Sequence, residues 1–351
     1  MHMADALISP AVGGTMWAVS GGLIAVCARK VKQTMRDNLV PMMGVLGAFI
    51  FAAQMINFSI PGTGSSGHLG GGLLLTVLLG PYAAFLVIAS VLTVQAFFFA
   101  DGGLLALGCN IFNLGFFPAF VAYPLVYRMV AGGRGGAFRN WAAALGAAVA
   151  GLLLGALGVV LETLASGISE LPFVTFAAMM LPIHLAIGLV EGLATAVVVS
   201  FVTRARPEAL YAVQEAGMRR GLWPVLAGLA AAAALLGGAG SWFASTHPDG
   251  LEWSIAKVTG KEELSGSDAG VRGELAKIQG KTAVLPDYGF KPGEAEAGEP
   301  EAEAESWPAV SAGTSLSGIV GGLMTLVLAC LAGVVLKGGF AGRTEEGRSG
   351  A

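Results

Sequence analysis

Two of the four histidines in this sequence stand in chemically unusual places. His2 directly follows Met1, and His68 lies in the glycine-rich stretch GTGSSGHLGGG. Methionine aminopeptidases remove Met1 only before a small second residue, so the bulky His2 should leave the Met1 amine in place. The Met1 amine, the deprotonated His2 amide and the His2 imidazole then form three adjacent nitrogen donors, and His68 could supply a fourth.

Nitrogen donors arranged in this way select a metal by geometry. Fused chelate rings formed by an amine, the adjacent amide nitrogen and an imidazole favour a planar arrangement. Planar nitrogen ligation suits Ni(II) or Cu(II), whereas zinc prefers a tetrahedron and magnesium and calcium prefer oxygen. The residues alone also allow a plainer interpretation, in which His2 is a solvated end group and His68 is one polar residue of a loop.

The composition indicates what kind of scaffold must bring these residues together. Of the 351 residues, 55% are apolar and 12% are charged, and the charged share is about half the roughly 25% that is usual in soluble domains. Apolar stretches long enough to cross a membrane recur along the chain. No basic residue precedes the first of them, so it does not resemble a cleaved signal peptide. The sequence therefore predicts an all-α polytopic membrane protein in a lipid bilayer.

The apolar segments define the expected membrane spans. They lie near residues 7–28, 38–57, 69–99, 104–127, 140–165, 172–203, 222–245 and 310–336. Segment 69–99 would be about 46 Å long as one helix, against a hydrocarbon core of about 30 Å, and Gly80-Pro81 lies in its middle. We therefore expect two short passes that turn at Gly80-Pro81, which gives a bundle of about seven helices to residue 203 and a two-helix hairpin after it.

The placement of basic residues orients these spans. Outside residues 247–307, every lysine and arginine falls in one of four segments, which are 29–36, 128–139, 204–220 and 337–351. The positive-inside rule assigns all four segments to the cytoplasm. We therefore expect a multi-pass protein of the cell (inner) membrane with an extracytoplasmic N-terminus and a cytoplasmic C-terminus, so that His2 and His68 both lie at the outer face.

The same pattern divides the chain into parts. We expect a seven-span body that binds the metal (1–205), a cytoplasmic connector (206–220), a two-span unit (221–337) and a cytoplasmic tail (338–351). Within the two-span unit, residues 247–307 are rich in charge and end in the low-complexity run GEAEAGEPEAEAES. Because such a run cannot bury enough apolar surface to order itself, we expect 247–307 to form a flexible extracytoplasmic loop.

Several longer stretches give the chain a family resemblance. They are the opening MHMADALISP, QMINFSIPGTGSSGHLGGGLL (54–74), VQAFFFADGGLLALGCNIFNLGFF (94–117) and PIHLAIGLVEGLATA (182–196). With them the chain resembles the substrate-binding M components, of NikM/CbiM type, of nickel and cobalt energy-coupling-factor (ECF) transporters. PDGLEWS (248–254) and LPDYGF (285–290) resemble the small N component of these systems, here fused behind the M component. The body would then be a bundle like the S components of such transporters.

This resemblance implies ligands, a cargo and partners. The metal ligands of the family fall on the Met1 amine, the His2 amide and imidazole nitrogens, and His68. The cargo would be Ni(II) or Co(II), bound as transported substrate, since nickel and cobalt members share these motifs. The implied partners are a transmembrane coupling (T/Q) subunit and two cytoplasmic ABC-type ATPase subunits, and no nucleic acid is expected.

Further polar residues could support this site. Asp101, Asn110 and Asn113 lie near the outer turn before the fifth span, where they could order the His68 loop as partners of metal-bound histidine often do. His184 and Glu191 share one helix face, and ionisable groups at membrane depth are candidates for function. For these two we favour a structural role, as interhelical hydrogen-bond partners.

Three classes of function are to be compared with these features. An ATP-driven uptake component needs a separate ATPase, because the sequence holds no G-x-x-x-x-G-K-[ST] loop: QGKT (279–282) has Leu275 where the first glycine belongs. A stand-alone secondary metal permease is the alternative, with the His184/Glu191 face and Gly80-Pro81 as its candidate features. An intramembrane metallohydrolase would need a pattern such as H-E-x-x-H, which no histidine here has, so we expect no enzyme.

Overall fold

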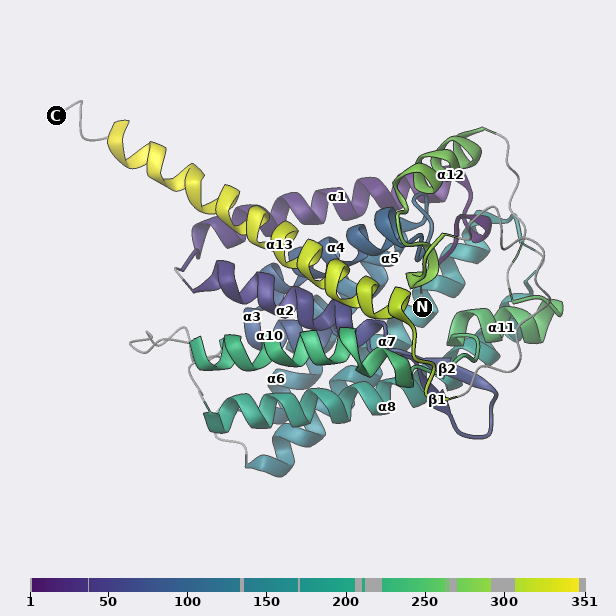
Figure 1. Ribbon diagram of the computed structural model, residues 1–351, viewed down its shortest axis with the longest axis horizontal. Coiled ribbons are helices and arrows are strands. Elements are labelled where there is room, and N and C mark those ends of the chain that lie inside the picture. Colours follow the sequence, from purple (N-terminus) through teal and green to yellow (C-terminus); the bar gives the residue numbers. More distant parts are fainter. Residues whose placement is uncertain are drawn as a thin grey trace.

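Helices make up most of the computed structural model of this chain, and Figure 1 shows many of them running side by side. The structure describes residues 2–36, 38–132, 136–169, 171–205, 210–211, 223–262, 264, 270–291 and 307–346. Met1 and most of the expected connector lie outside these residues.

The first part of the chain forms a bundle of seven helical segments. Six helices of the described chain are long and apolar enough to cross a membrane, which confirms the all-α polytopic fold class. In chain order the bundle contains α1 (Pro10–Gln33), α2 (Leu39–Gln54), α3 (Gly72–Leu79), α4 (Pro81–Phe98), the continuous run of α5 (Leu107–Ile111), the π-helix η2 (Phe112–Tyr127) and α6 (Arg128–Ala131), then α7 (Ala137–Ser166) and α8 (Phe173–Ala205).

Local sequence sets where α1 begins and ends. The Ser9 side chain caps the helix by accepting a hydrogen bond from the Val12 amide, and Pro10 occupies the first turn, where its missing N–H costs nothing. Lys30 and Lys32 lie in the last turn, where positive charge interacts favourably with the helix dipole. The N-terminal tail therefore ends at Ser9, and the residues before it are free to lie on the end of the bundle.

The break expected at Gly80-Pro81 is present. α3 ends at Leu79 and α4 begins at Pro81, while Gly80 between them has a φ of 83°, a left-handed conformation that favours glycine. α3 has only eight residues, or about 12 Å, so the helix alone is too short to cross the hydrocarbon core. The first of the two expected passes is thus helical only in part, and buried non-helical residues precede α3.

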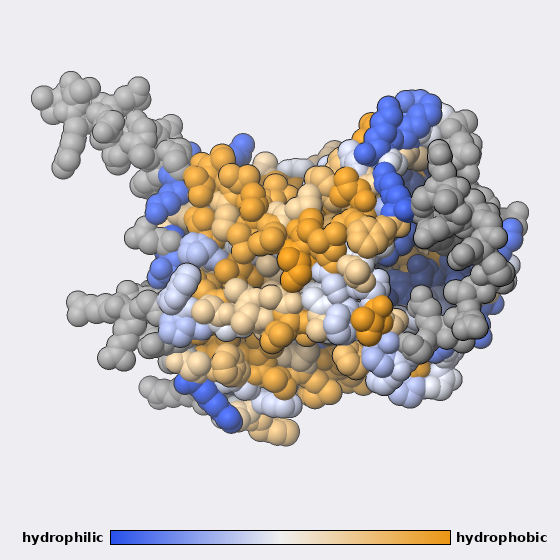
Figure 2. Space-filling model, viewed as in Figure 1, coloured by the Kyte–Doolittle hydropathy of each residue, from blue (hydrophilic) through white to orange (hydrophobic). Residues whose placement is uncertain are grey.

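The bundle exposes many apolar side chains. Figure 2 shows hydrophobic residues over the middle of the molecule and hydrophilic residues toward both ends. Leu189, Leu193 and Val197 of α8 are among these exposed side chains. Exposed apolar surface of this extent is expected where lipid replaces water, as in a multi-pass membrane protein.

A small β-hairpin connects α2 to α3. Strand β1 (Phe58–Ile60) pairs antiparallel with β2 (Ser65–Gly67). β2 lies deep in the protein, because a Cβ atom on Gly67 would come within 2.5 Å of the Ile187 side chain of α8. Glycine at this position allows the strand to approach α8 and leads the chain directly into His68.

The C-terminal unit packs on the bundle. Helices α10 (Trp223–Gly238) and α13 (Ala312–Glu346) both contact α2, and Figure 1 shows α13 crossing this face of the bundle. The short helix η4 (Gly240–Phe243) follows α10. Gly237 and Gly318 let α10 and α13 approach closely, since a Cβ on Gly318 would lie 2.1 Å from the Gly237 carbonyl oxygen.

The prediction of a flexible loop over residues 247–307 is wrong for much of that stretch. The structure has three helices there, which are α11 (Gly250–Thr259), α12 (Val271–Thr282) and η5 (Pro286–Tyr288). Only the low-complexity run, residues 292–306, lies outside the described residues together with a few positions between α11 and α12. The composition of the whole stretch therefore concealed two ordered helices.

A capping box explains why α11 forms within such a polar sequence. Asp249 accepts hydrogen bonds from the amides of Leu251 and Glu252, and the Glu252 side chain accepts one from the Asp249 amide. This reciprocal pairing satisfies backbone donors that the start of a helix otherwise leaves open. The residues PDGLE thus encode a helix start, which an average over charged residues does not detect.

Candidate metal centre

The N-terminal tail is fixed through its backbone to α5 and to the segment that precedes it. Asn110 brackets Met3: its Oδ1 accepts from the Met3 amide at 2.8 Å, and its Nδ2 donates to the Met3 carbonyl at 3.2 Å. The Gly103 amide donates to the same carbonyl at 2.9 Å. Because the Met3 side chain is also fully buried, the tail has one register, and this register sets the position of His2.

Asp5 anchors the tail a second time. It begins the short helix η1 (Asp5–Leu7), and its Oδ1 accepts a hydrogen bond from the Ala106 amide at 3.0 Å. The approach requires glycine at position 103, because a Cβ there would lie 1.8 Å from the same carboxylate oxygen. An aspartate three residues after His2 therefore has a mechanical role in holding the tail.

The anchored tail places His2 against His68. The two imidazole rings stack with centroids 5.0 Å apart and planes 12° apart. Both are buried, with 6% of the His2 side chain and 8% of His68 exposed. The structure thus brings together the two histidines that the sequence analysis paired.

The two nitrogens of His2 have different surroundings. Nδ1 lies 2.8 Å from Oδ1 of Asp101, whereas Nε2 is buried and has no hydrogen-bond partner among the described residues. The other oxygen of Asp101 accepts a short hydrogen bond from the Tyr288 hydroxyl. Burial raises the pKa of Asp101, but the His2 imidazole and the Tyr288 hydrogen bond outweigh it and hold that pKa below its usual range.

His68 is held in the form that binds metals. Burial lowers the pKa of His68 to about 3, so its imidazole is neutral at physiological pH. Its Nδ1 lies 3.2 Å from the Leu69 carbonyl oxygen. With the proton on Nδ1, where it can be donated to that carbonyl, Nε2 keeps a lone pair for a metal.

The backbone that follows His68 is clamped inside the bundle. The Gly70 amide donates to Oε2 of Glu191 at 2.7 Å, and the Gly70 carbonyl accepts from Nε2 of Gln54 at 2.8 Å. Gln95 donates in turn to Oε1 of Gln54 at 2.9 Å. Non-helical backbone at membrane depth is tolerated where its polar groups are satisfied in this way. Side chains of α2, α4 and α8 therefore hold the segment that carries His68.

Of the remaining candidate residues, His184 lines a small cavity together with His68, and Asn113 lies elsewhere. Asn113 donates to Oε2 of Glu162 at 2.7 Å, between η2 and α7, and so faces away from the tail. Nδ1 of His184 lies 2.8 Å from the Met180 carbonyl oxygen, one turn earlier in its own helix. Of the three supporting residues expected near the site, Asp101 contacts His2, Asn110 holds the neighbouring backbone, and Asn113 does neither.

The C-terminal unit covers the tail from one side, which the sequence analysis did not foresee. Gln279 of α12 donates to the carbonyls of Ala96 and Gly102, at 2.9 and 2.8 Å. Arg272 of α12 donates to the Ile8 carbonyl at 2.9 Å. These contacts, and the hydrogen bond from Tyr288 to Asp101, make residues 270–291 a cap over the tail.

The PDGLE segment covers the site from the hairpin side. The Ser66 amide donates to the Pro248 carbonyl at 2.8 Å, and the Ser66 hydroxyl donates to the His247 carbonyl at 2.7 Å. The Trp253 indole of α11 donates to the Thr63 carbonyl at 3.0 Å. In the sequence, the motif PDGLEWS marks the segment that docks on the hairpin, and LPDYGF marks the end of the cap. These motifs indicated a fused unit but not the surface on which it docks.

The side chains described here form only part of a coordination shell. No group of three or more His, Cys, Asp or Glu side chains able to hold a metal occurs among the described residues. Two imidazoles in contact are nevertheless a donor pair that late divalent metals accept. Backbone nitrogens of the tail are the donors that could complete the shell, as the sequence analysis expects for the Met1 amine and the His2 amide.

Models of two protein families match this chain. A family described as "Cobalt uptake substrate-specific transmembrane region" matches residues 2–209, and a PDGLE domain matches residues 223–338. The first match contains the tail, both histidines and Asp101, while the second contains Asp249 and Tyr288.

Individual proteins are similar over the same parts. A protein of Archaeoglobus fulgidus named for fused nickel transport (NikMN) is 39% identical over 214 residues, which are 60% of this chain and 68% of that protein. The fused nickel transport protein NikMN of Rhodobacter capsulatus is 30% identical over 320 residues, covering 82% of this chain and 88% of that protein. A solved structure of a transition metal transporter is 32% identical with a TM-score of 0.51, covering 58% of this chain and 93% of that one.

Proposed function

The chain belongs to the family of cobalt-uptake substrate-specific transmembrane proteins, and on this premise we propose that it is the metal-binding membrane component of an ATP-driven nickel or cobalt uptake transporter. It binds the divalent cation as transported substrate at the end of the bundle that carries the tail. The ligands are the Met1 amine, the amide and imidazole nitrogens of His2, and the His68 imidazole.

The observation that carries this proposal is the buried contact between His2 and His68. Two imidazoles stack 5.0 Å apart in a place where water is largely excluded, and burying polar rings is costly unless a partner compensates. A late divalent metal is such a partner, because it accepts neutral nitrogen donors. The relatives named for nickel transport and the family described for cobalt uptake support the same pair of metals.

Chelation by His2 must use its Nδ1 atom. The amide nitrogen, Cα, Cβ, Cγ and Nδ1 of one histidine close a six-membered ring with a metal, whereas Nε2 points away from its own backbone. In the structure Nδ1 is the atom in contact with Asp101. Metal binding therefore exchanges the contact of His2 with Asp101 for a bond to the metal, and Asp101 remains beside the ion as a nearby negative charge.

Energy for uptake comes from other subunits in this proposal. The sequence contains no phosphate-binding loop of the G-x-x-x-x-G-K-[ST] type, so a transmembrane coupling subunit and two cytoplasmic ATPases drive the cycle. The basic segment at the end of α1 supports a cytoplasmic location for the end of the bundle opposite the tail. The tail and the cap then face the outside of the cell membrane, where the cation is captured.

Metal titration of the purified full chain tests the ligand assignment. We expect His2→Ala and His68→Gln each to abolish tight Ni²⁺ binding in calorimetry. His247→Gln is the matched control, because His247 is exposed and only its backbone carbonyl takes part in docking. Nickel affinity in His68→Gln equal to that of the unchanged protein would contradict the assignment.

Transport in proteoliposomes tests the need for partners. We expect the chain alone to bind metal without accumulating it, and to accumulate it only with the coupling subunit, the ATPases and ATP. Uptake by the chain alone under an ion gradient would instead identify a stand-alone secondary permease.

A further inference from the structure

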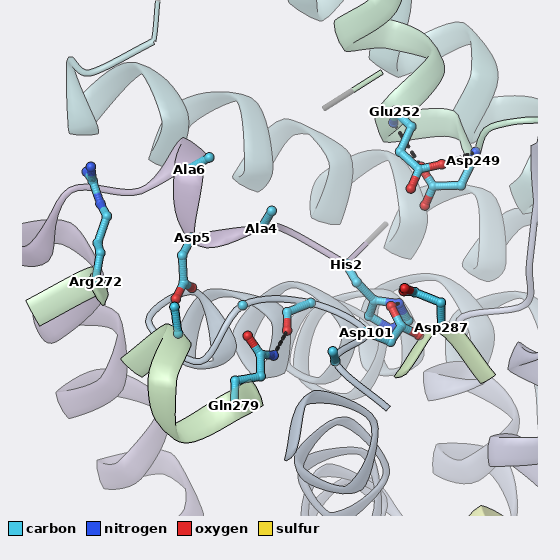
Figure 3. Close-up of a pocket in the computed structure, with 14 residues that line it drawn as sticks. His2, Ala4, Asp5, Ala6, Asp101, Asp249, Glu252, Arg272, Gln279 and Asp287 are labelled. Atoms are coloured by element: carbon cyan, nitrogen blue, oxygen red, sulfur yellow. Dashed lines mark hydrogen bonds and ion pairs between the residues drawn. The ribbon is translucent and has the colours of Figure 1, made fainter. Parts of the chain in front are cut away.

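An open cavity of about 310 Å³ lies directly beside His2. Figure 3 shows His2, Asp101 and Asp287 close together at one side of it, with Asp249 and Glu252 at another. The tail and the loop after α4 form part of the wall, and α11, α12 and η5 form the rest. Bundle and C-terminal unit therefore build this cavity jointly.

The lining of the cavity is strongly acidic. Arg272 is the one basic side chain among the described lining residues other than His2 itself, whereas five of these residues carry carboxylates: Asp5, Asp101, Asp249, Glu252 and Asp287. Hydrogen bonds from backbone amides, such as those to Asp249, stabilise a carboxylate without removing its charge. A cavity with one sign of charge and low-dielectric walls concentrates counter-ions inside it.

The ring of His2, which lines the same cavity, carries an unpaired nitrogen. The Nε2 atom of His2 is buried without a hydrogen-bond partner among the described residues, although the ring lines the cavity and only 6% of the side chain is exposed. Buried polar atoms in native proteins nearly always have a partner, so an unpaired one indicates a polar or charged species that enters. This observation does not depend on the carboxylates, and like them it indicates that a polar or charged species enters the cavity.

The cavity is large enough for a hydrated ion. Each water occupies about 30 Å³ in the liquid, so a divalent ion with roughly six waters needs on the order of 200 Å³. The cavity of about 310 Å³ has room for such an ion with its first hydration shell intact.

We propose that this cavity is an antechamber that binds a hydrated divalent cation through outer-sphere contacts before nitrogen ligation begins. The inference rests on the proposed function for the step that follows, in which the ion passes to His2 and His68. Within the antechamber the carboxylates contact the water shell, and Nε2 of His2 accepts a hydrogen bond from a bound water.

This arrangement separates the speed of capture from the strength of retention. Carboxylates around a hydrated ion raise its local concentration, and such steering increases association rates by about 10- to 1000-fold in charged clefts. Nitrogen ligands deeper in the site determine how slowly the ion leaves. Neutralising a carboxylate of the C-terminal unit should therefore slow association and leave dissociation unchanged.

Two substitutions remove charge from the antechamber while keeping its shape. Asp287→Asn suits the φ of 50° at this position, since asparagine adopts the left-handed conformation readily. Glu252→Gln keeps the capping box, because glutamine serves the same role there. Glu274→Gln is the matched control: it removes one charge from α12 at a side chain that is 72% exposed and does not line the cavity.

Stopped-flow mixing of Ni²⁺ with the full chain measures the predicted effect. We expect the double variant Asp287→Asn/Glu252→Gln to associate about tenfold more slowly, with a weaker dependence on ionic strength and an unchanged dissociation rate. Glu274→Gln should associate as the unchanged protein does. An unchanged association rate in the double variant, or a loss that appears only in dissociation, would overturn the antechamber.

A second measurement keeps this inference distinct from the nitrogen site. In His68→Gln, where tight binding is absent, Mn²⁺ monitored by water-proton relaxation should still bind weakly, since Mn²⁺ favours oxygen ligands. The double substitution added to this variant should abolish that binding. If Mn²⁺ binds equally with and without the two carboxylates, the antechamber is wrong even where the nickel titrations uphold the nitrogen ligands.

Discussion

Nδ1 of His2 lies 2.8 Å from Oδ1 of Asp101, so this carboxylate oxygen occupies the place where a metal bound to Nδ1 would lie. Two effects of Asp101 on metal binding therefore oppose each other. The hydrogen bond to His2 stabilises the metal-free protein by about 1.5–3 kcal/mol, as hydrogen bonds to charged groups do. The carboxylate also attracts the bound cation, by about 4 kcal/mol per unit charge at about 4 Å for a partly solvated pair.

The attraction is the larger effect, so Asp101→Asn should weaken nickel binding. We expect a loss of about tenfold in affinity, in the range found for residues that support metal-bound histidine. Calorimetry on the full chain measures it. Tyr288→Phe is the companion variant, because it removes the hydrogen bond to Asp101 and leaves the carboxylate charge. It should weaken nickel binding much less than Asp101→Asn does. Tighter binding in Asp101→Asn would mean that competition for Nδ1 outweighs the attraction.

Acid should open the site through His68, at the PDGLE segment that lines a small cavity together with His68. Burial lowers the pKa of His68 to about 3, against an ordinary value of 6.5 for an exposed histidine. The open state therefore takes up a proton more readily, so the closed state loses stability as the pH falls below about 6.5. The equilibrium constant for opening should be about 30-fold larger at pH 5 than at pH 7.5.

Limited proteolysis of α11 measures this opening. His68→Gln is the control, because glutamine takes up no proton, and its α11 should open equally at both pH values. Asp101 does not obscure the comparison, since its pKa lies below the usual range and it stays ionised throughout. The same pH dependence in both proteins would assign the effect to other groups.

Glu191 should act through its acceptor oxygen and not through its charge. Its Oε2 accepts from the Gly70 amide at 2.7 Å, two residues after His68. Glu191→Gln keeps an acceptor oxygen and should bind nickel within about threefold of the unchanged protein. Glu191→Ala leaves a buried amide unsatisfied, at a cost of about 1–3 kcal/mol, and should weaken nickel binding by at least about tenfold. Calorimetry with thermal unfolding as a stability control tests this, and equal losses in both variants would show that the charge is required.

The sequence was sufficient where local chemistry decides the structure. Gly80-Pro81 predicted a break because proline removes a helix hydrogen bond and clashes with the preceding turn, and α3 and α4 meet there. His2 and His68 were paired from the positions of apolar spans and basic segments, and their rings are in contact. These inferences needed only span length, charge placement and donor type.

The sequence was insufficient where packing between distant segments decides. Nothing near Asn113 indicates that it faces Glu162 of α7 and not the tail, because both directions are open to a residue at that point of a helix. The charged composition of residues 247–307 gave no indication of α11, because the start of this helix depends on two side chains, Asp249 and Glu252. The contact of Tyr288 with Asp101 joins residues 187 positions apart, and only the folded chain reveals it.

The Met1 amine is the ligand on which the whole account depends, and one titration tests it most directly. Nickel affinity is compared between the full chain carrying an N-terminal extension and the same chain carrying an extension after Ala351. An extension before Met1 turns the amine into an amide and removes one chelate ring, although His2, His68 and the cap remain. We predict that the N-terminal extension abolishes tight binding, that the C-terminal extension is tolerated, and that proteolytic release of a Met-His start restores binding. Equal nickel affinity in the two extended proteins would contradict the account.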